Sequence, residues 1–268
     1  MSIFRTIAMF LYLFGYMIVH YGTLRRGERA LAAGDTETVE QLVDRHIPRW
    51  SRGILKVTGV TLTVEGLENI PKEGPCVFVG NHRSYYDIPL LLASLDKPHG
   101  ILAKEELFKN PLAGWFLRCM GAVSIERGKG DTTTVEKLTN ECKNGTGIMI
   151  FPEGTRTKTG KLGVIKSGAF VIAAASGADM LPVRIIYGTK DGRLHLFCKV
   201  RIVFGEPIPA ADLQIRDQSH KMAELRRMKN RLRDELEQLL ADNAFAMRLA
   251  ETAAKEHAAP DDKPQLPE

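Results

Sequence analysis

The alternation of short strand-like segments with helix-like segments between residues 61 and 204 most strongly constrains the fold. Six apolar segments have the length and flanking turn residues of strands: Thr61–Val64, Cys76–Val79, Ala122–Ile125, Ile148–Phe151, Leu181–Ile186 and Lys199–Phe204. Four helical patterns lie between them, at Ile88–Leu95, Pro111–Met120, Thr132–Lys143 and Lys166–Ser176. Such alternation predicts an α/β domain of three layers, with helices on both faces of one sheet.

The amino-terminal segment Ile7–Val19 is a run of 13 residues without any charge, followed by Arg25, Arg26 and Arg29. A membrane-spanning helix needs roughly 20 apolar residues, so the run is short for a span unless flanking residues lengthen it. A signal peptide is disfavoured because no small-x-small cleavage site follows. A buried core helix is the other alternative. We interpret the run as membrane-associating, because its tyrosines are typical interfacial anchors and the arginines favour a cytoplasmic position for the downstream chain.

A second helical pattern covers Thr36–Thr58, where apolar residues recur at three- and four-residue steps. A basic stripe accompanies it, formed by Arg45, Arg49, Arg52 and Lys56. Such a stripe is either a solvated face or a contact with anionic lipid, and its position just after the uncharged run favours lipid.

The sequence patterns divide the chain into four parts. Membrane-associating helices occupy residues 1–58 and the α/β domain occupies residues 59–215. Residues 216–256 form an amphipathic helix, because leucine and methionine recur along one side of it. The remaining residues, 257–268, are rich in proline and acidic residues and are expected to be a disordered tail.

The charge and the spacing of the cysteines disfavour several kinds of binding partner and site. The net charge is +5 from 37 basic and 32 acidic residues, and residues 221–233 hold six basic side chains against one acidic. This charge suits an anionic partner, but nucleic acid is disfavoured because no recognition motif or interleaved aromatic residue accompanies the basic ones. The four cysteines have no metal-ligand spacing, so we expect neither a metal site nor a disulfide framework.

The first chemically informative segment follows the strand-like segment Cys76–Val79. It places His82 and Asp87 five positions apart on a turn between a strand and a helix. Open α/β sheets bind their ligands at such strand ends. Across this turn the carboxylate can hold one ring nitrogen and leave the other free as a general base. On these two residues alone, a purely structural hydrogen bond is the alternative.

A second polar turn, FPEGTR at residues 151–156, also follows a strand-like segment. In this turn Gly154 permits a sharp change of direction, and Arg156 offers a guanidinium group that suits a phosphate. Arg127 follows the predicted strand Ala122–Ile125, and Lys104 precedes the predicted helix that begins at Pro111. If these three cations border one edge of the sheet, an anionic head group is their natural ligand; otherwise they are ordinary surface residues.

These segments belong to four ordered blocks: NHRSYYD at residues 81–87, GAVSIER at 121–127, FPEGTR at 151–156 and LPV at 181–183. In this order, over roughly residues 60–210, they resemble the glycerolipid acyltransferase family and in particular its lysophosphatidate acyltransferases. The second block ends in an arginine, before which the family usually has aspartate or a similar residue and this sequence has Glu126. The segment KSGAF, which begins at Lys166 and contains Gly168, resembles a further segment of the family.

The resemblance implies a three-layer domain with a mixed sheet. It also implies transfer of a fatty acyl group from acyl-CoA or acyl carrier protein to the free hydroxyl of 1-acyl-glycerol 3-phosphate, giving phosphatidate without a metal or other cofactor. His82, oriented by Asp87, would take the hydroxyl proton and return it to the leaving thiolate. The implied substrate-binding residues are Lys104, Arg127, Glu153, Gly154, Thr155 and Arg156.

Such an enzyme would work on the cytoplasmic face of the inner membrane, anchored to an anionic lipid surface by its amino-terminal segment. Two alternatives stay open. The acceptor is another lyso-lipid or glycerol 3-phosphate, since the blocks do not separate these acceptors. Alternatively, the chain is a non-catalytic membrane-binding protein, which the intact pair of His82 and Asp87 disfavours.

Overall fold

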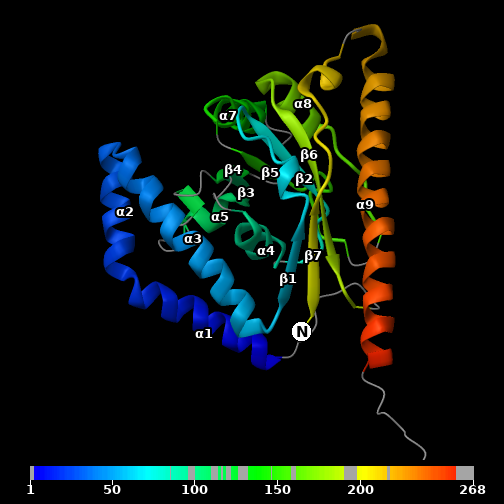
Figure 1. The fold of residues 1–268 in the computed structure, drawn as a ribbon. Helices are drawn as coiled ribbons and strands as arrows, with labels where there is room; N and C mark the ends of the chain where they lie inside the picture. Colours follow the sequence, from blue (N-terminus) through cyan, green and yellow to red (C-terminus); the bar gives the residue numbers. More distant parts are fainter. Residues whose placement is uncertain are drawn as a thin grey trace, which may run out of the picture.

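A mixed sheet of seven strands forms the centre of the part of the chain that the structure describes (Figure 1). The structure is a computed structural model that describes residues 3–84, 86–95, 100–109, 114–115, 117–118, 122–125, 132–145, 147–157, 161–189, 198–215 and 218–257. The strands are β1 (Thr61–Glu65), β2 (Cys76–Gly80), β3 (Gly100–Lys104), β4 (Val123–Ile125), β5 (Ile148–Ile150), β6 (Asp179–Tyr187) and β7 (Lys199–Phe204). Their order is β1-β7-β6-β2-β5-β3-β4, and every neighbouring pair is parallel except β6 and β7.

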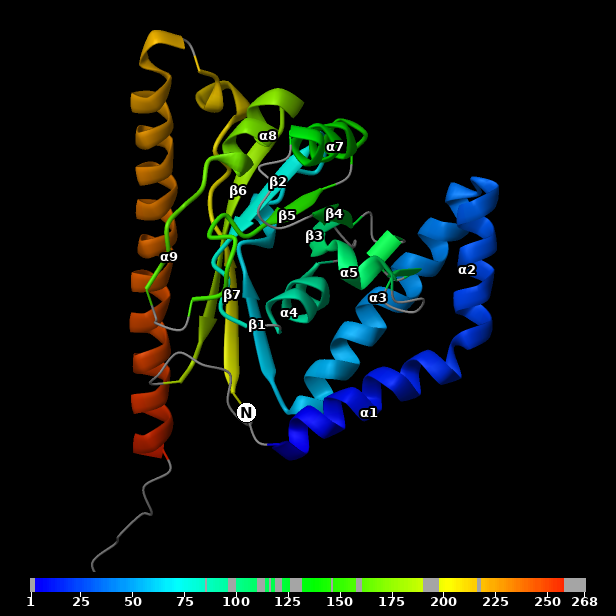
Figure 2. The same cartoon turned by 180° about the vertical axis from the view of Figure 1, so that it is seen from behind.

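Helices cover both faces of this sheet, as the two opposite views show (Figures 1 and 2). The described helices are α1 (Ile3–Val19), α2 (Tyr21–Ala33), α3 (Thr36–Thr58), α4 (Asp87–Ser94), α5 (Glu105–Lys109), α7 (Thr132–Lys143), α8 (Gly168–Ser176) and α9 (Lys221–His257). The described residues also form three short 3-10 turns, at Leu67–Asn69, Ala210–Leu213 and Gln218–His220. One hydrophobic cluster joins α3 and α4 to one face of the sheet, and a second joins α7, α8 and α9 to the other face. The three-layer α/β fold with a mixed sheet is therefore confirmed.

Strand β2 shows how the sequence produces this layering. All five of its residues are buried; Phe78 belongs to the cluster under α3 and α4, whereas Val77 and Val79 belong to the cluster under α7 to α9. Successive side chains of a strand point to opposite faces, so a strand that helices cover on both sides is apolar throughout. Helix α9 contributes Leu232 and Leu236, both almost fully buried and four residues apart on one face of the helix.

The amino-terminal helices pack beside α4 through α3, whose apolar face contributes to the cluster on that side of the sheet. Helix α2 ends at Gly34 in the left-handed conformation (φ 72°), and Asp35 caps α3 by accepting a hydrogen bond from the backbone N–H of Thr38 at 3.0 Å. The hydroxyl of Tyr16 in α1 donates to the carbonyl oxygen of His46 in α3 at 3.2 Å. Among the described residues no helix combines the length and apolarity that crossing a membrane requires, so membrane association of this region stays a prediction.

Strand β3 was not predicted by the sequence patterns. Its residues, Gly100–Lys104, include glycine, alanine and lysine, which are weak strand formers. The segment becomes a strand because it pairs with β5 on one side and β4 on the other. Such pairing depends on residues distant in sequence, which a local pattern does not contain.

Other predictions differ at element ends or lie outside the described residues. The carboxy-terminal helix runs over Lys221–His257 rather than residues 216–256. Helix α8 begins at Gly168, two residues later than predicted. The predicted helix at residues 111–120 and the predicted tail lie mostly outside the described residues; His257, the first residue of that tail, ends α9 instead.

Candidate active site

The segment NHRSYYD connects the end of β2 to the start of α4, at the carboxyl edge of the parallel strands. Its first residue, Asn81, is fully paired with the backbone of β6. The side-chain amide donates to the carbonyl oxygen of Ile185 at 3.0 Å, and the N–H of Ile185 donates to the amide oxygen at 2.8 Å. This buried pair fixes where the turn leaves the sheet, immediately before His82.

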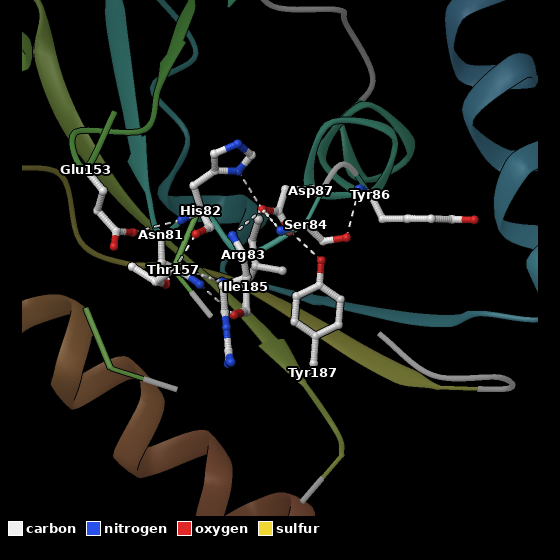
Figure 3. Close-up of polar contacts among 10 residues, drawn as sticks. All are labelled: Asn81, His82, Arg83, Ser84, Tyr86, Asp87, Glu153, Thr157, Ile185 and Tyr187. Atoms are coloured by element: carbon white, nitrogen blue, oxygen red, sulfur yellow. Dashed lines mark hydrogen bonds and ion pairs between the residues drawn. The ribbon is translucent and has the colours of Figure 1, made fainter. Parts of the chain in front are cut away.

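The turn brings His82 and Asp87 together, as their spacing predicts (Figure 3). The Nδ1 atom of His82 lies 2.8 Å from Oδ2 of Asp87. The same oxygen accepts hydrogen bonds from the backbone N–H groups of Arg83 at 2.7 Å and Ser84 at 2.9 Å. Since an ionised carboxylate only accepts hydrogen bonds, we assign the ring proton to Nδ1, which leaves the lone pair of Nε2 free.

His82 is also held by the loop that follows β5. Its ring stacks on Phe151 with a centroid distance of 4.2 Å and an angle of 17° between the planes. Its backbone N–H donates to Oε1 of Glu153 at 2.9 Å, and its carbonyl oxygen accepts from the N–H of Thr157 at 2.9 Å. The imidazole is therefore fixed on several sides, yet 19% of the side chain stays exposed for a substrate to reach.

The FPEGTR loop is built around two constrained residues. The side chain of Glu153 is buried, and its second oxygen, Oε2, accepts a hydrogen bond from the N–H of Gly163 at 2.6 Å. Gly154 adopts a left-handed conformation with φ 67°, and a Cβ atom there would lie 2.8 Å from Nζ of Lys166. Because L-residues rarely adopt this conformation, the position favours glycine; the contact adds less to this preference, since the end of the Lys166 side chain can shift.

The structure describes the three predicted cations to different extents. Arg156 and Thr155 are exposed on the FPEGTR loop, next to Glu153. Lys104 ends β3, a neighbour of β5 in the sheet, so its backbone lies at the same carboxyl edge; its side chain is outside the described part. Arg127 lies outside the described residues. The structure thus joins His82, Glu153 and the FPEGTR loop, and leaves the roles of the three cations as predictions.

Two residues near the site were missed by the sequence reasoning. Tyr187, at the end of β6, donates a hydrogen bond from its hydroxyl to Oδ1 of Asp87. Arg184, in the same strand, is 2% exposed, and its Nε and Nη1 atoms have no hydrogen-bond partner among the described residues. Burial and the nearby guanidinium of Arg83 lower the pKa of Arg184 to about 10, while Glu153 and Glu237 partly offset this change. No local sequence signal connects either residue to a turn 100 positions earlier.

Comparison with known proteins agrees with this geometry. Residues 61–186 match the family model described as Acyltransferase. These residues are therefore similar in sequence to the acyltransferase domains that this model describes. The match covers the His82–Asp87 turn, the FPEGTR loop and most of β6, including Arg184. Within the described residues, no group of three or more histidine, cysteine, aspartate or glutamate side chains is placed to hold a metal ion.

Several named acyltransferases are similar to this part of the chain. A chloroplastic 1-acyl-sn-glycerol-3-phosphate acyltransferase of Brassica napus is 36% identical over 172 residues, which cover 60% of this chain and 49% of the relative. The enzyme of the same name from Pseudomonas aeruginosa is 35% identical over 130 residues, covering 47% of this chain and 50% of the relative. The chain thus spans about half the length of these relatives. The crystal structure of the 1-acyl-sn-glycerophosphate acyltransferase PlsC from Thermotoga maritima superposes with a TM-score of 0.67 at 26% identity, covering 88% of this chain and 96% of that one.

Proposed function

We propose that the protein transfers a fatty acyl group from an acyl thioester to the free hydroxyl of 1-acyl-glycerol 3-phosphate and so produces phosphatidate. The observation that carries the proposal is the buried Asp87 carboxylate, which holds Nδ1 of His82 at 2.8 Å and leaves Nε2 free on a partly exposed ring. The names of the relatives and of the superposed structure support this choice of reaction and acceptor.

In this mechanism Nε2 of His82 takes the proton of the acceptor hydroxyl as the oxygen attacks the thioester carbonyl. The C–S bond of the tetrahedral intermediate then breaks, and the proton passes from the imidazolium to the departing thiolate. Asp87 stabilises the imidazolium because its carboxylate stays fixed against Nδ1 throughout. The balanced result is one ester and one thiol, and the chemistry requires no metal or bound cofactor.

The phosphate of the acceptor would be held by the cations around the sheet edge, namely Arg156, Lys104 and Arg127. Arginine suits this role because its planar group forms two parallel hydrogen bonds with phosphate oxygens. The neighbouring Glu153, Gly154 and Thr155 would shape the acceptor site, since Glu153 connects the FPEGTR loop directly to the backbone of His82. A fixed phosphate holds the hydroxyl near Nε2, so that its attack becomes effectively intramolecular.

A second acceptor is favoured by one further relative. A lyso-ornithine lipid O-acyltransferase of Pseudomonas aeruginosa is 37% identical over 119 residues, which cover 44% of this chain and 45% of the relative. The same pair of His82 and Asp87 would acylate a hydroxyl of such a lipid, because the proton transfer does not depend on the head group. The phosphate-binding cations favour 1-acyl-glycerol 3-phosphate as the first candidate.

We also propose that the amino-terminal helices attach the protein to an anionic membrane surface on the cytoplasmic side. Apolar side chains of α1 are strongly exposed, with Leu11 at 67% and Ile18 at 76%. The basic stripe of α3 is exposed as well, at Arg45, Arg49, Arg52 and Lys56. Exposed apolar groups beside cations are the combination that binds anionic lipid, where the acceptor itself resides.

The test is an acyl-transfer assay on the purified full chain with acyl-CoA or acyl carrier protein and a panel of lyso-lipids, read by mass spectrometry. Wild type should acylate 1-acyl-glycerol 3-phosphate, and His82→Ala should reduce kcat by roughly 100- to 10,000-fold because the general base is lost. His220→Ala, at an exposed histidine preceding α9, is the matched control and should keep full activity.

The outcomes separate the candidate functions. Preference for a lyso-aminolipid would replace the proposed acceptor, and full turnover by His82→Ala would reject the mechanism. Vesicle binding without transfer to any member of the panel would instead identify a non-catalytic membrane protein.

A further inference from the structure

Tyr187 lies at the end of β6, one residue beyond the matched family region, and its hydroxyl donates a hydrogen bond to Asp87 (Figure 3). We propose that Tyr187 is a positioning residue of the reaction, which acts by fixing the carboxylate that orients His82. The inference rests on the proposed function for its kinetic consequence, whereas the contact itself is a property of the fold.

The two oxygens of Asp87 are held in different ways. Oδ2 receives the Nδ1 proton of His82 and the backbone N–H groups of Arg83 and Ser84. Oδ1 receives the hydroxyl of Tyr187, the one donor that the described residues provide to this atom. The donors on Oδ2 already restrain rotation about the Cβ–Cγ bond, because this oxygen lies off the bond axis, but they hold the carboxylate at only one of its two oxygens. A donor on Oδ1 holds the group at a second point and so fixes more closely the direction in which Oδ2 meets the imidazole.

Burial makes this contact strong. Asp87 is fully buried and Tyr187 is 4% exposed, so water does not compete for the hydrogen bond. Desolvation and, secondly, the charge of Asp87 raise the pKa of Tyr187 well above its usual value, so the hydroxyl keeps its proton and always donates. Without the hydroxyl, Oδ1 would be a buried carboxylate oxygen with no donor from the described residues, a state that costs free energy unless the carboxylate moves.

The position of Tyr187 follows from the sheet register. Gly80 at the end of β2 pairs with Val183 in β6, and the side chain of Asn81 is bonded to the backbone of Ile185. Residues 183, 185 and 187 point to the same face of the sheet, where all three belong to the cluster under α3 and α4. The ring of Tyr187 is therefore directed toward the amino-terminal end of α4, where Asp87 begins the helix.

The first measurement compares Tyr187→Phe with wild type under saturating substrate. We expect kcat to fall about 10- to 100-fold, the effect of losing one hydrogen bond to a charged group, while KM for donor and acceptor stays unchanged. Tyr86→Phe is the matched control: Tyr86 is equally buried, but its hydroxyl points away from Asp87 in Figure 3, so kcat should stay at the wild-type value.

A double-mutant cycle with Asp87→Asn then separates positioning from general stabilisation. If Tyr187 acts through the carboxylate, Tyr187→Phe should change kcat less than about twofold when it is added to the Asp87→Asn variant, because the group that it positions is gone. If the fold-changes in kcat caused by Tyr187→Phe and by Asp87→Asn multiply in the double variant, the inference is overturned. A wild-type kcat for Tyr187→Phe alone would also overturn it. A Tyr187→Phe variant that does not fold would overturn it too, because the hydroxyl would then serve the fold.

A second readout does not depend on turnover. The Nδ1 proton of a histidine bonded to a carboxylate gives a resolved downfield proton NMR signal, which should shift or broaden in Tyr187→Phe and stay in place in Tyr86→Phe. An unchanged signal in Tyr187→Phe contradicts the inference. If wild type transfers no acyl group, the proposed function fails, and this signal still decides whether Tyr187 positions the pair.

Discussion

Glu153 connects two parts of the chain: His82, which lies 71 residues before it, and Gly163, which lies 10 residues after it. Its two carboxylate oxygens accept from the N–H of His82 at 2.9 Å and from the N–H of Gly163 at 2.6 Å. Both donors are backbone groups in partly buried positions and Glu153 itself is buried, so water competes only in part for these hydrogen bonds. A single side chain thus couples the backbone of the proposed general base to the loop that follows FPEGTR.

Glu153→Gln tests this coupling. An amide has one acceptor oxygen, so one of the two N–H groups would face the amide NH2 and lose its acceptor. We expect the free energy of unfolding to fall by about 1–3 kcal/mol and activity to fall with it. Urea unfolding and kcat/KM are the measurements, and Glu206→Gln, at an exposed glutamate, is the control. Unchanged stability would show that the carboxylate is not needed to hold the two segments.

At the scale of elements, α9 takes part in the site although it lies outside residues 61–186. Arg233 in α9 donates from Nη2 to the carbonyl oxygen of Gly163 at 2.8 Å. The N–H of Gly163 in turn donates to Glu153, which accepts the N–H of His82. A continuous series of hydrogen bonds therefore runs from a helix on one face of the sheet to the turn that carries the histidine.

Arg233→Met should loosen the loop around Gly163 while keeping the aliphatic part of the side chain. Since Arg233 is about one-third exposed, we expect a loss of only about 1 kcal/mol and roughly a fivefold fall in kcat/KM. Hydrogen exchange of the Gly163 amide should quicken relative to wild type. Arg226→Met, at an exposed position of the same helix, should change neither quantity. Identical exchange in both variants would mean that α9 does not restrain the loop.

For the whole molecule, the layer order separates two surfaces of different character. The exposed apolar residues of α1 lie on the α3 and α4 side of the sheet, whereas α9 lies on the opposite side (Figures 1 and 2). The candidate site lies between them, at the carboxyl edge of β2 and β5. In the proposed membrane-bound enzyme, this arrangement would let one side meet the lipid surface while the other faces away from it.

Binding to vesicles with anionic lipid tests this orientation. Ile18→Asp should weaken binding at least about tenfold, because it removes an apolar group from the contact and adds repulsion from the lipid charge. Met222→Asp in α9 is matched in exposure, 77% against 76%, and should bind as wild type does. Raising the salt concentration should weaken binding in both proteins through screening of the basic stripe. Equal losses of vesicle binding in Ile18→Asp and Met222→Asp would contradict attachment to the membrane through α1.

Much of the fold follows from short-range patterns. The segments predicted at Cys76–Val79 and Lys199–Phe204 are β2 and β7, and the helix predicted at Thr36–Thr58 is α3. The contact of His82 with Asp87 was also predictable, because a turn of five residues brings its own ends together. Strand β3 was not, since its weak local preferences are overridden by pairing with β4 and β5.

The sequence by itself determined the chemistry that is local: apolar periodicity, the turn that joins a histidine to an aspartate, and the glycine that lets the FPEGTR loop turn. Tertiary structure alone decided which distant groups complete the site. Tyr187 reaches Asp87 across 100 residues and Arg233 reaches Gly163 across 70. These contacts depend on strand order and on the packing of α9. The strand order and the packing of α9 arise from burying apolar surface over the whole domain, and no short stretch of sequence indicates them.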